Sequence, residues 1–97
     1  METIIDSNNG HNKVLVEKIN AAWNDGLMQD NFRYIVYAIA MRDRDEVKEK
    51  VGGDYCQLLS DIIDGCDKCA ISEVLTNVCD DTDLENILQF VGFERWY

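Results

Sequence analysis

Four cysteines stand in a symmetric pattern, and their thiols are the side chains of this sequence whose spacing best suits metal or redox chemistry. The pattern reads Cys56-x9-Cys66-x2-Cys69-x9-Cys79. Two thiolates at the central C-x2-C spacing can chelate one zinc ion. The outer cysteines each lie about 15 Å away along a straight helix, which is too far for all four to meet at one metal. We therefore expect these four side chains to act as small, buried or half-buried apolar groups, with a Cys-based zinc or redox module as an alternative.

The same spacing resembles that of the twin C-x9-C helical hairpins, in which two disulfides join a pair of antiparallel helices. The resemblance covers residues 56–79 and implies that Cys56 pairs with Cys79 and Cys66 with Cys69. That family leaves several more residues between its two helices than the two found here. The first thirty residues also lack a basic start followed by an apolar stretch, which is the pattern of a secretory signal. We therefore expect a cytoplasmic protein with reduced thiols and no bound metal or other cofactor.

Carboxylates are concentrated in the second half of the chain. Residues 1–53 hold nine acidic and seven basic side chains, whereas residues 54–97 hold ten acidic and two basic ones. The net charge is −10 and the isoelectric point is near 4.3. Direct binding to nucleic acid is disfavoured, because phosphates would repel this surface at long range. A basic protein surface is the partner that this charge favours.

These charges predict a non-catalytic, acidic protein-binding module. Its sharpest form is an inhibitor that docks an acidic face on the nucleic-acid-binding surface of a partner, with carboxylates standing where phosphates would stand. Small viral counter-defence proteins, including anti-CRISPR proteins, and bacterial immunity proteins for nuclease toxins are similar in size and acidity. The residues we expect to contact the partner are Asp61, Asp64, Asp67, Glu73, Asp80, Asp81, Asp83, Glu85, Trp96 and Tyr97.

Other readings of the same residues stay open. The carboxylates could be a solvated face that keeps a small protein soluble. A structural helical adaptor or homodimer could assemble through apolar and aromatic surfaces, and the acidity would then be incidental. Catalysis has little support, since the chain has one histidine, no glycine-rich phosphate loop and no nucleophile beside a recognisable base. The segment Asp80-Asp81-Thr82-Asp83 lacks the glycine and alternating ligands of a calcium loop, and it is more typical of a helix N-terminus.

Helices must position these side chains, because the chain has no proline and its apolar residues recur at helical spacing. We predict an all-α bundle of five to six short antiparallel helices, with a flexible arm over residues 1–12 and a single helical domain over 13–97. No apolar run approaches the roughly 18 residues that would cross a membrane. A central helix over about residues 31–42 is apolar nearly all the way round, which favours burial at the centre of the core.

Start and stop signals mark the other helices. Asn12 is a plausible N-cap for a helix over 13–24 that ends near Gly26. Capping-box patterns occur at Asp43 with Glu46, Asp54 with Gln57, and Thr82 with Glu85. A weak 13-residue period that aligns Leu58, Ile71 and Leu84 predicts three short helices in the second half. The final aromatics, Phe90, Phe93, Trp96 and Tyr97, are expected either to complete the core or to anchor a partner.

Overall fold

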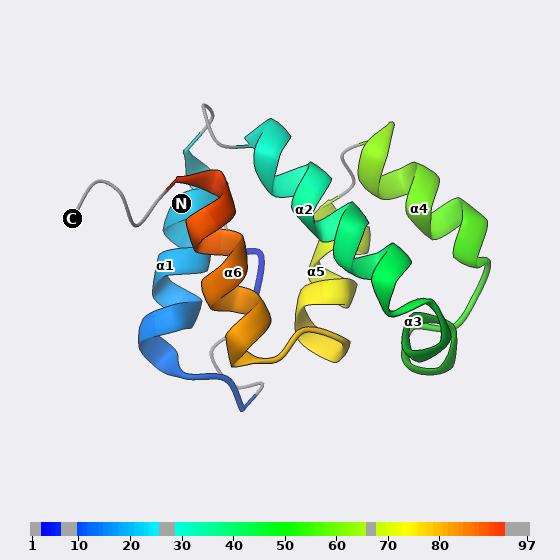
Figure 1. The fold of residues 1–97 in the computed structure, drawn as a ribbon, viewed down its shortest axis with the longest axis horizontal. Coiled ribbons are helices and arrows are strands. Elements are labelled where there is room, and N and C mark those ends of the chain that lie inside the picture. The colour runs from blue at the N-terminus through cyan, green and yellow to red at the C-terminus, as the bar shows by residue number, and fades with distance from the viewer. Residues whose placement is uncertain (1–2, 7–9, 26–28, 66–67, 93–97) are drawn as a thin grey trace.

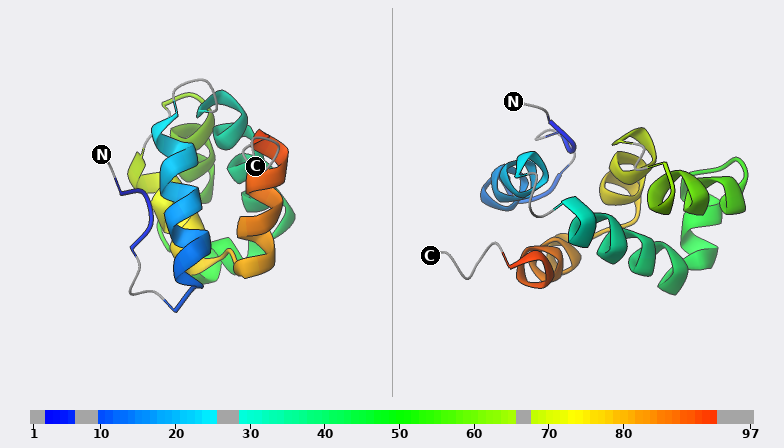
Figure 2. Two further views of the ribbon diagram at one scale, coloured as in Figure 1. Left: turned by 90° about the vertical axis from the view of Figure 1, so that its left-hand side faces the viewer. Right: turned by 90° about the horizontal axis from the view of Figure 1, so that it is seen from above.

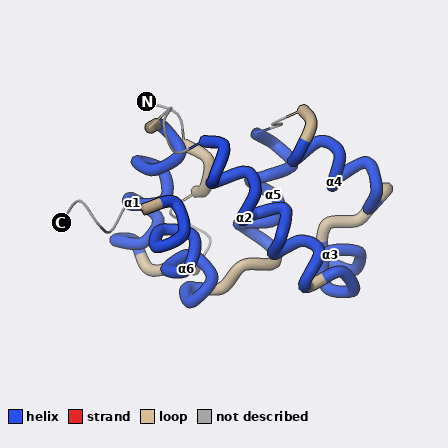
Figure 3. Tube along the Cα trace, turned by 45° about the horizontal axis from the view of Figure 1, so that its top comes forward, coloured by secondary structure: helices blue, strands red, loops and turns tan. Residues whose placement is uncertain are grey.

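The computed structural model describes residues 3–6, 10–25, 29–65 and 68–92, and these segments contain six α-helices and no strand (Figures 1 and 3). The predicted all-α bundle is therefore confirmed. In the part of the chain described, no helix is both long and apolar enough to cross a membrane. The helices are α1 (Lys13–Asn24), α2 (Gln29–Arg42), α3 (Arg44–Lys50), α4 (Tyr55–Ile63), α5 (Lys68–Asn77) and α6 (Asp81–Val91).

Helix α2 is the centre of the bundle and packs against each of the other five helices. In Figure 1 it runs between α6 on one side and α4 on the other, and Figure 2 shows α1 and α5 behind it. Phe32 and Val36 are fully buried on its inner face, and the Phe32 ring meets the Trp23 ring of α1 edge to face, with centroids 5.5 Å apart. The predicted central helix is confirmed, although its outer face stays exposed at Tyr34, Ala38 and Met41.

Residues 3–6, which belong to the predicted N-terminal arm, lie against the core. Ile4 and Ile5 are each only 1% exposed and belong to the core. The side chain of Asn20 in α1 holds their backbone, since its Oδ1 accepts from the N–H groups of Ile4 and Ile5 at 2.8 and 3.1 Å. Its Nδ2 also donates to the Ile5 carbonyl at 3.1 Å. Because this amide satisfies three backbone groups, an irregular segment can lie against the core without leaving them unpaired.

Two of the predicted N-caps are present. Asn12 caps α1, with its side chain accepting from the Val14 N–H at 2.9 Å. Asp54 caps α4 by accepting from the N–H groups of Cys56 and Gln57 at 2.9 and 3.3 Å. The Gln57 side chain does not complete a capping box there, because its Nε2 donates to Asp61 at 2.9 Å. Such caps replace hydrogen bonds that the first helical turn cannot make internally.

The other two predicted capping boxes are wrong. At α3, the N-cap residue Asp43 makes no side-chain hydrogen bond to the helix, because Arg42 holds its carboxylate. At α6 the box is formed two residues earlier than Thr82 with Glu85. Asp80 accepts from the Asp83 N–H at 2.8 Å, and the Asp83 carboxylate accepts from the Asp80 N–H at 3.3 Å. The predicted helix end at Gly26 lies outside the described residues.

Candidate functional site

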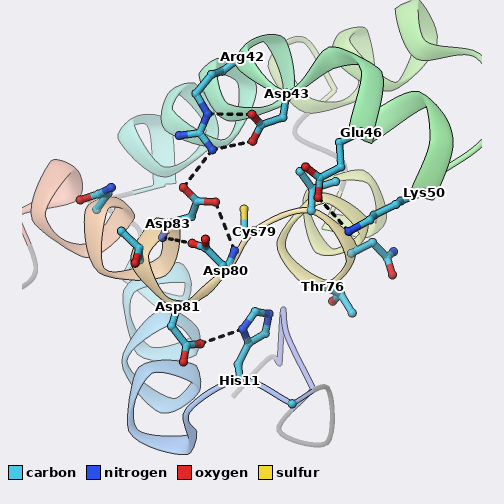
Figure 4. A pocket seen from close by; sticks show the side chains of 15 residues that line it. His11, Arg42, Asp43, Glu46, Lys50, Thr76, Cys79, Asp80, Asp81 and Asp83 are labelled. Atoms are coloured by element: carbon cyan, nitrogen blue, oxygen red, sulfur yellow. Dashed lines mark hydrogen bonds and ion pairs between the residues drawn. The ribbon is translucent and has the colours of Figure 1, made fainter.

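A polar hollow of about 890 Å³ opens where three distant parts of the chain meet, and we call it the acidic hollow (Figure 4). Its walls are the segment before α1, the junction of α2 and α3 with the rest of α3, and the loop from α5 into α6. Five carboxylates and two permanent cations line it, so its charge is negative. The ionisable lining residues are Asp43, Glu46, Asp80, Asp81, Asp83, Arg42, Lys50 and His11, with the Cys79 thiol beside them.

Arg42 closes one wall of the hollow by binding two carboxylates at once. Its Nε and Nη2 donate to Asp43 at 3.0 and 2.6 Å, and Nη2 also donates to Asp83 at 3.0 Å. These bonds tie the end of α2 to the start of α6. Hydrogen bonds first to Asp43 and then to Asp83 raise the pKa of Arg42 above its ordinary value, and the guanidinium lowers the pKa of Asp43. Both groups are therefore charged at neutral pH.

The carboxylate of Asp83 binds other groups of the protein. The residue is only 7% exposed, and its carboxylate is shared between the Asp80 backbone and Arg42. A buried carboxylate is stable as a charge when it is paired and hydrogen-bonded, as here. The sequence places Asp83 among the residues that contact a partner, but its burial and pairing leave it a structural role, and we remove it from the docking residues.

Asp80 and Asp81 are the exposed carboxylates at the rim of the hollow. Asp80 directs Oδ1 to the backbone of α6, and Asp81 directs Oδ1 to His11 Nδ1 at 3.0 Å and to the Asn12 N–H at 3.4 Å. Among the described residues, neither of their Oδ2 atoms accepts a hydrogen bond, and neither carboxylate is paired with a lysine or arginine. The protein thus holds both side chains in place while one oxygen of each remains available.

Of the remaining predicted docking residues, those that the structure describes are not part of this hollow. Asp61 lies on α4 and accepts from Gln57 at 2.9 Å, and Asp64, the C-cap of α4, accepts from Ser60 at 3.2 Å. Figure 1 places α4 across α2 from α6. Glu73 on α5 and Glu85 on α6 are exposed, whereas Asp67, Trp96 and Tyr97 lie outside the described residues. The structure therefore gathers Asp80, Asp81 and Asp83 in one place and keeps the α4 pair apart from them.

The sequence did not identify several of the residues that line the hollow. It assigned no role in docking to His11, Arg42, Asp43, Glu46 or Lys50. The neighbouring pair Arg42-Asp43 is a local signal for an ion pair, as is the i,i+4 spacing of Glu46 and Lys50, which are joined at 2.9 Å. No local signal connects Arg42 with a carboxylate 41 residues away.

The cysteines do not form the pair that the twin C-x9-C resemblance implies. Cys56 and Cys79 are both free thiols, the first exposed at the start of α4 and the second buried beside the hollow. Cys69 is exposed as well, so the expected burial is right for Cys79 only; Cys66 lies outside the described residues. Burial raises the pKa of the Cys79 thiol far above its ordinary value, which makes it a poor nucleophile. Across the described segments, no group of three or more His, Cys, Asp or Glu side chains could hold a metal ion.

No family model, curated protein or solved structure matches this chain. The acidic hollow and the surrounding surface are therefore the features that bear on its function.

The Arg42–Asp43 pair predicts a specific dependence of stability on pH. The pKa of Asp43 is lowered in the folded protein, so its contribution to stability is present above the ordinary carboxyl pKa of about 3.9 and is lost as pH falls through the folded value. We expect the Asp43→Asn variant to lose less stability than the wild type between about pH 5 and pH 2. Urea unfolding across that range measures this difference. Asp45→Asn, an exposed carboxylate of α3, is the control, and parallel curves for the wild type and Asp43→Asn would contradict the assignment.

Proposed function

We propose that this protein is a non-catalytic binding module that docks on the basic surface of a partner protein, with the acidic hollow receiving lysine or arginine side chains. The observation that carries the proposal is the exposure and hydrogen bonding of Asp80 and Asp81. Both are exposed and held by hydrogen bonds at the rim of a hollow in which carboxylates outnumber permanent cations. Carboxylates fixed before binding lose little conformational freedom when a cation arrives, which favours affinity.

The charge of the whole chain supports the same proposal. A net charge of −10 on 97 residues accelerates encounter with a basic surface and disfavours acidic partners. The cations of the hollow compensate carboxylates other than Asp80 and Asp81, because Lys50 pairs with Glu46 and Arg42 pairs with Asp43 and Asp83. The partner class that we propose is a nucleic-acid-handling protein, since its binding surface already carries cations spaced for phosphates. Occupying that surface would make the protein an inhibitor by competition.

A lysine-rich peptide is a direct probe of the hollow. We expect a labelled peptide of alternating lysine and serine to bind the wild type, with an affinity that falls as salt is raised. The Asp80→Asn/Asp81→Asn variant should bind it about tenfold more weakly and with a shallower salt dependence. Asparagine keeps an N-cap acceptor at position 80, so the fold should be preserved. Fluorescence anisotropy at two or more salt concentrations measures both quantities.

The Asp61→Asn/Asp64→Asn variant is the matched control, because it removes the same charge from α4. The proposal predicts a much smaller loss of affinity for this variant. Equal losses in the two variants would mean that the peptide responds to net charge alone, as expected for a merely solubilising surface. A larger loss in the α4 variant would move the docking site to α4.

A further inference from the structure

The proposed docking site at the hollow does not involve the outer face of α2, which is partly exposed and where the Arg33 guanidinium lies 5.1 Å from the centroid of the Tyr34 ring. Tyr34, Ala38 and Met41 follow one another at positions i, i+4 and i+7, which places them on one side of the helix. We call these three residues the α2 stripe. Tyr34 and Met41 are 50% and 53% exposed, although α2 packs against each of the other five helices. A helix that is apolar nearly all round is normally covered on every side.

The stripe lies next to the acidic hollow. Met41 is followed directly by Arg42, whose guanidinium forms part of the hollow's wall. Figures 1 and 2 show α2 beside α6, the helix whose N-cap and first residue are the rim carboxylates Asp80 and Asp81. The wall of the acidic hollow therefore begins one residue beyond the stripe along α2.

We propose that the α2 stripe is the apolar half of the docking surface, and that its occupant is an amphipathic basic segment of the partner protein. This inference rests on the proposed function. Apolar side chains of that segment would cover Tyr34, Ala38 and Met41, while its lysines or arginines would enter the acidic hollow. Apolar centres supply most of the affinity of such interfaces, and charges beside them supply selectivity and speed of encounter.

Charge complementarity selects this occupant over a second copy of the chain. Two copies would each bring a net charge of −10 to the contact, and the hollow next to the stripe would face another acidic surface. A basic segment has the opposite sign. The stripe spans eight residues of helix, or about 10 Å from Tyr34 to Met41, so a helical partner would present apolar residues about seven positions apart with basic residues beyond them.

Two peptides of equal length and charge test the inference. The first alternates lysine and serine, and the second carries leucine at two serine positions about two helical turns apart. We expect the leucine peptide to bind the wild type about tenfold more tightly. The Ala38→Glu variant should lose that gain, even though its extra negative charge attracts lysine. Val14→Glu is the matched control, because Val14 on α1 is also apolar and 58% exposed.

The outcomes distinguish failure of the stripe proposal from failure of the hollow proposal. The role of the stripe would be overturned if the wild type bound both peptides equally, or if Val14→Glu also lost the gain in affinity from leucine. The proposed role of the hollow would survive either result, provided that binding still requires Asp80 and Asp81. Absence of binding by either peptide would overturn both. Light scattering that shows a dimer dispersed by Ala38→Glu would assign the stripe to a second copy and overturn the basic occupant. Thermal unfolding verifies the variants, and Met41→Gln replaces Ala38→Glu if the latter does not fold.

Discussion

Replacing Phe32 with alanine is expected to lower the free energy of unfolding by about 3–5 kcal/mol. Phe32 is fully buried in α2, and its ring packs edge to face on Trp23 at 5.5 Å and 71°. The substitution removes this contact and leaves a cavity between α1 and the central helix. Domains of this size have a total stability of about 5–15 kcal/mol, so the variant should retain only part of its folded population at 37 °C. Urea unfolding followed by circular dichroism measures the loss.

Tyr34→Ala is the control for this experiment, because Tyr34 lies two residues along the same helix but is 50% exposed. Its loss of stability should be small beside that of Phe32→Ala, since half of its surface is already in water. Similar losses for the two variants would show that α2 does not present these faces to the core and to solvent as described.

Replacing Ile4 and Ile5 together with alanine is the second change with a large expected effect. Each side chain is 1% exposed, and truncating a buried isoleucine costs about 2–5 kcal/mol. The double variant is therefore expected to be close to unfolding, and the two single variants allow the loss to be measured by urea titration. Thr3→Ala, an exposed position in the same segment, should leave stability nearly unchanged.

This experiment also distinguishes two descriptions of the N-terminus. If residues 4 and 5 belonged to a loose arm, the double variant would unfold at the same urea concentration as the wild type. The structure requires a large shift instead, because both side chains are buried in the core, where Asn20 holds their backbone N–H groups. An effect on the hollow is expected to follow, since the segment leads to His11, which holds Asp81 at 3.0 Å.

Local rules account for the helices that the sequence determined by itself. The absence of proline, the apolar spacing over residues 13–24 and 31–42, and the caps at Asn12 and Asp54 each involve residues within a turn or two of one another. Such signals act through hydrogen bonds and side-chain spacing along one helix, so they can be read without knowing how the helices pack. The acidity of the second half was likewise evident from the sequence, and it favours a partner with a basic surface.

The local rules failed at positions where several side chains compete for the same hydrogen-bond partner. Asp43 has the type and position of an N-cap, but the guanidinium of Arg42 binds its carboxylate more strongly than a helix N–H would. Asp80 rather than Thr82 caps α6, because the chain enters that helix two residues earlier and both partners of the box are carboxylates. Which of several nearby acceptors is used depends on where the other groups lie in space.

Only the tertiary structure decided which carboxylates are available at the surface. Arg42 meets Asp83 across 41 residues, Asn20 receives Ile4 and Ile5, and the α2 stripe stays bare because no helix of the described chain covers it. Each of these facts follows from how whole helices pack, and residue types and spacing along the chain contain no direct record of that packing. The sequence therefore determined the helices and their charge, whereas the packing turned some carboxylates into structural ion pairs and left Asp80 and Asp81 exposed at the rim of a hollow.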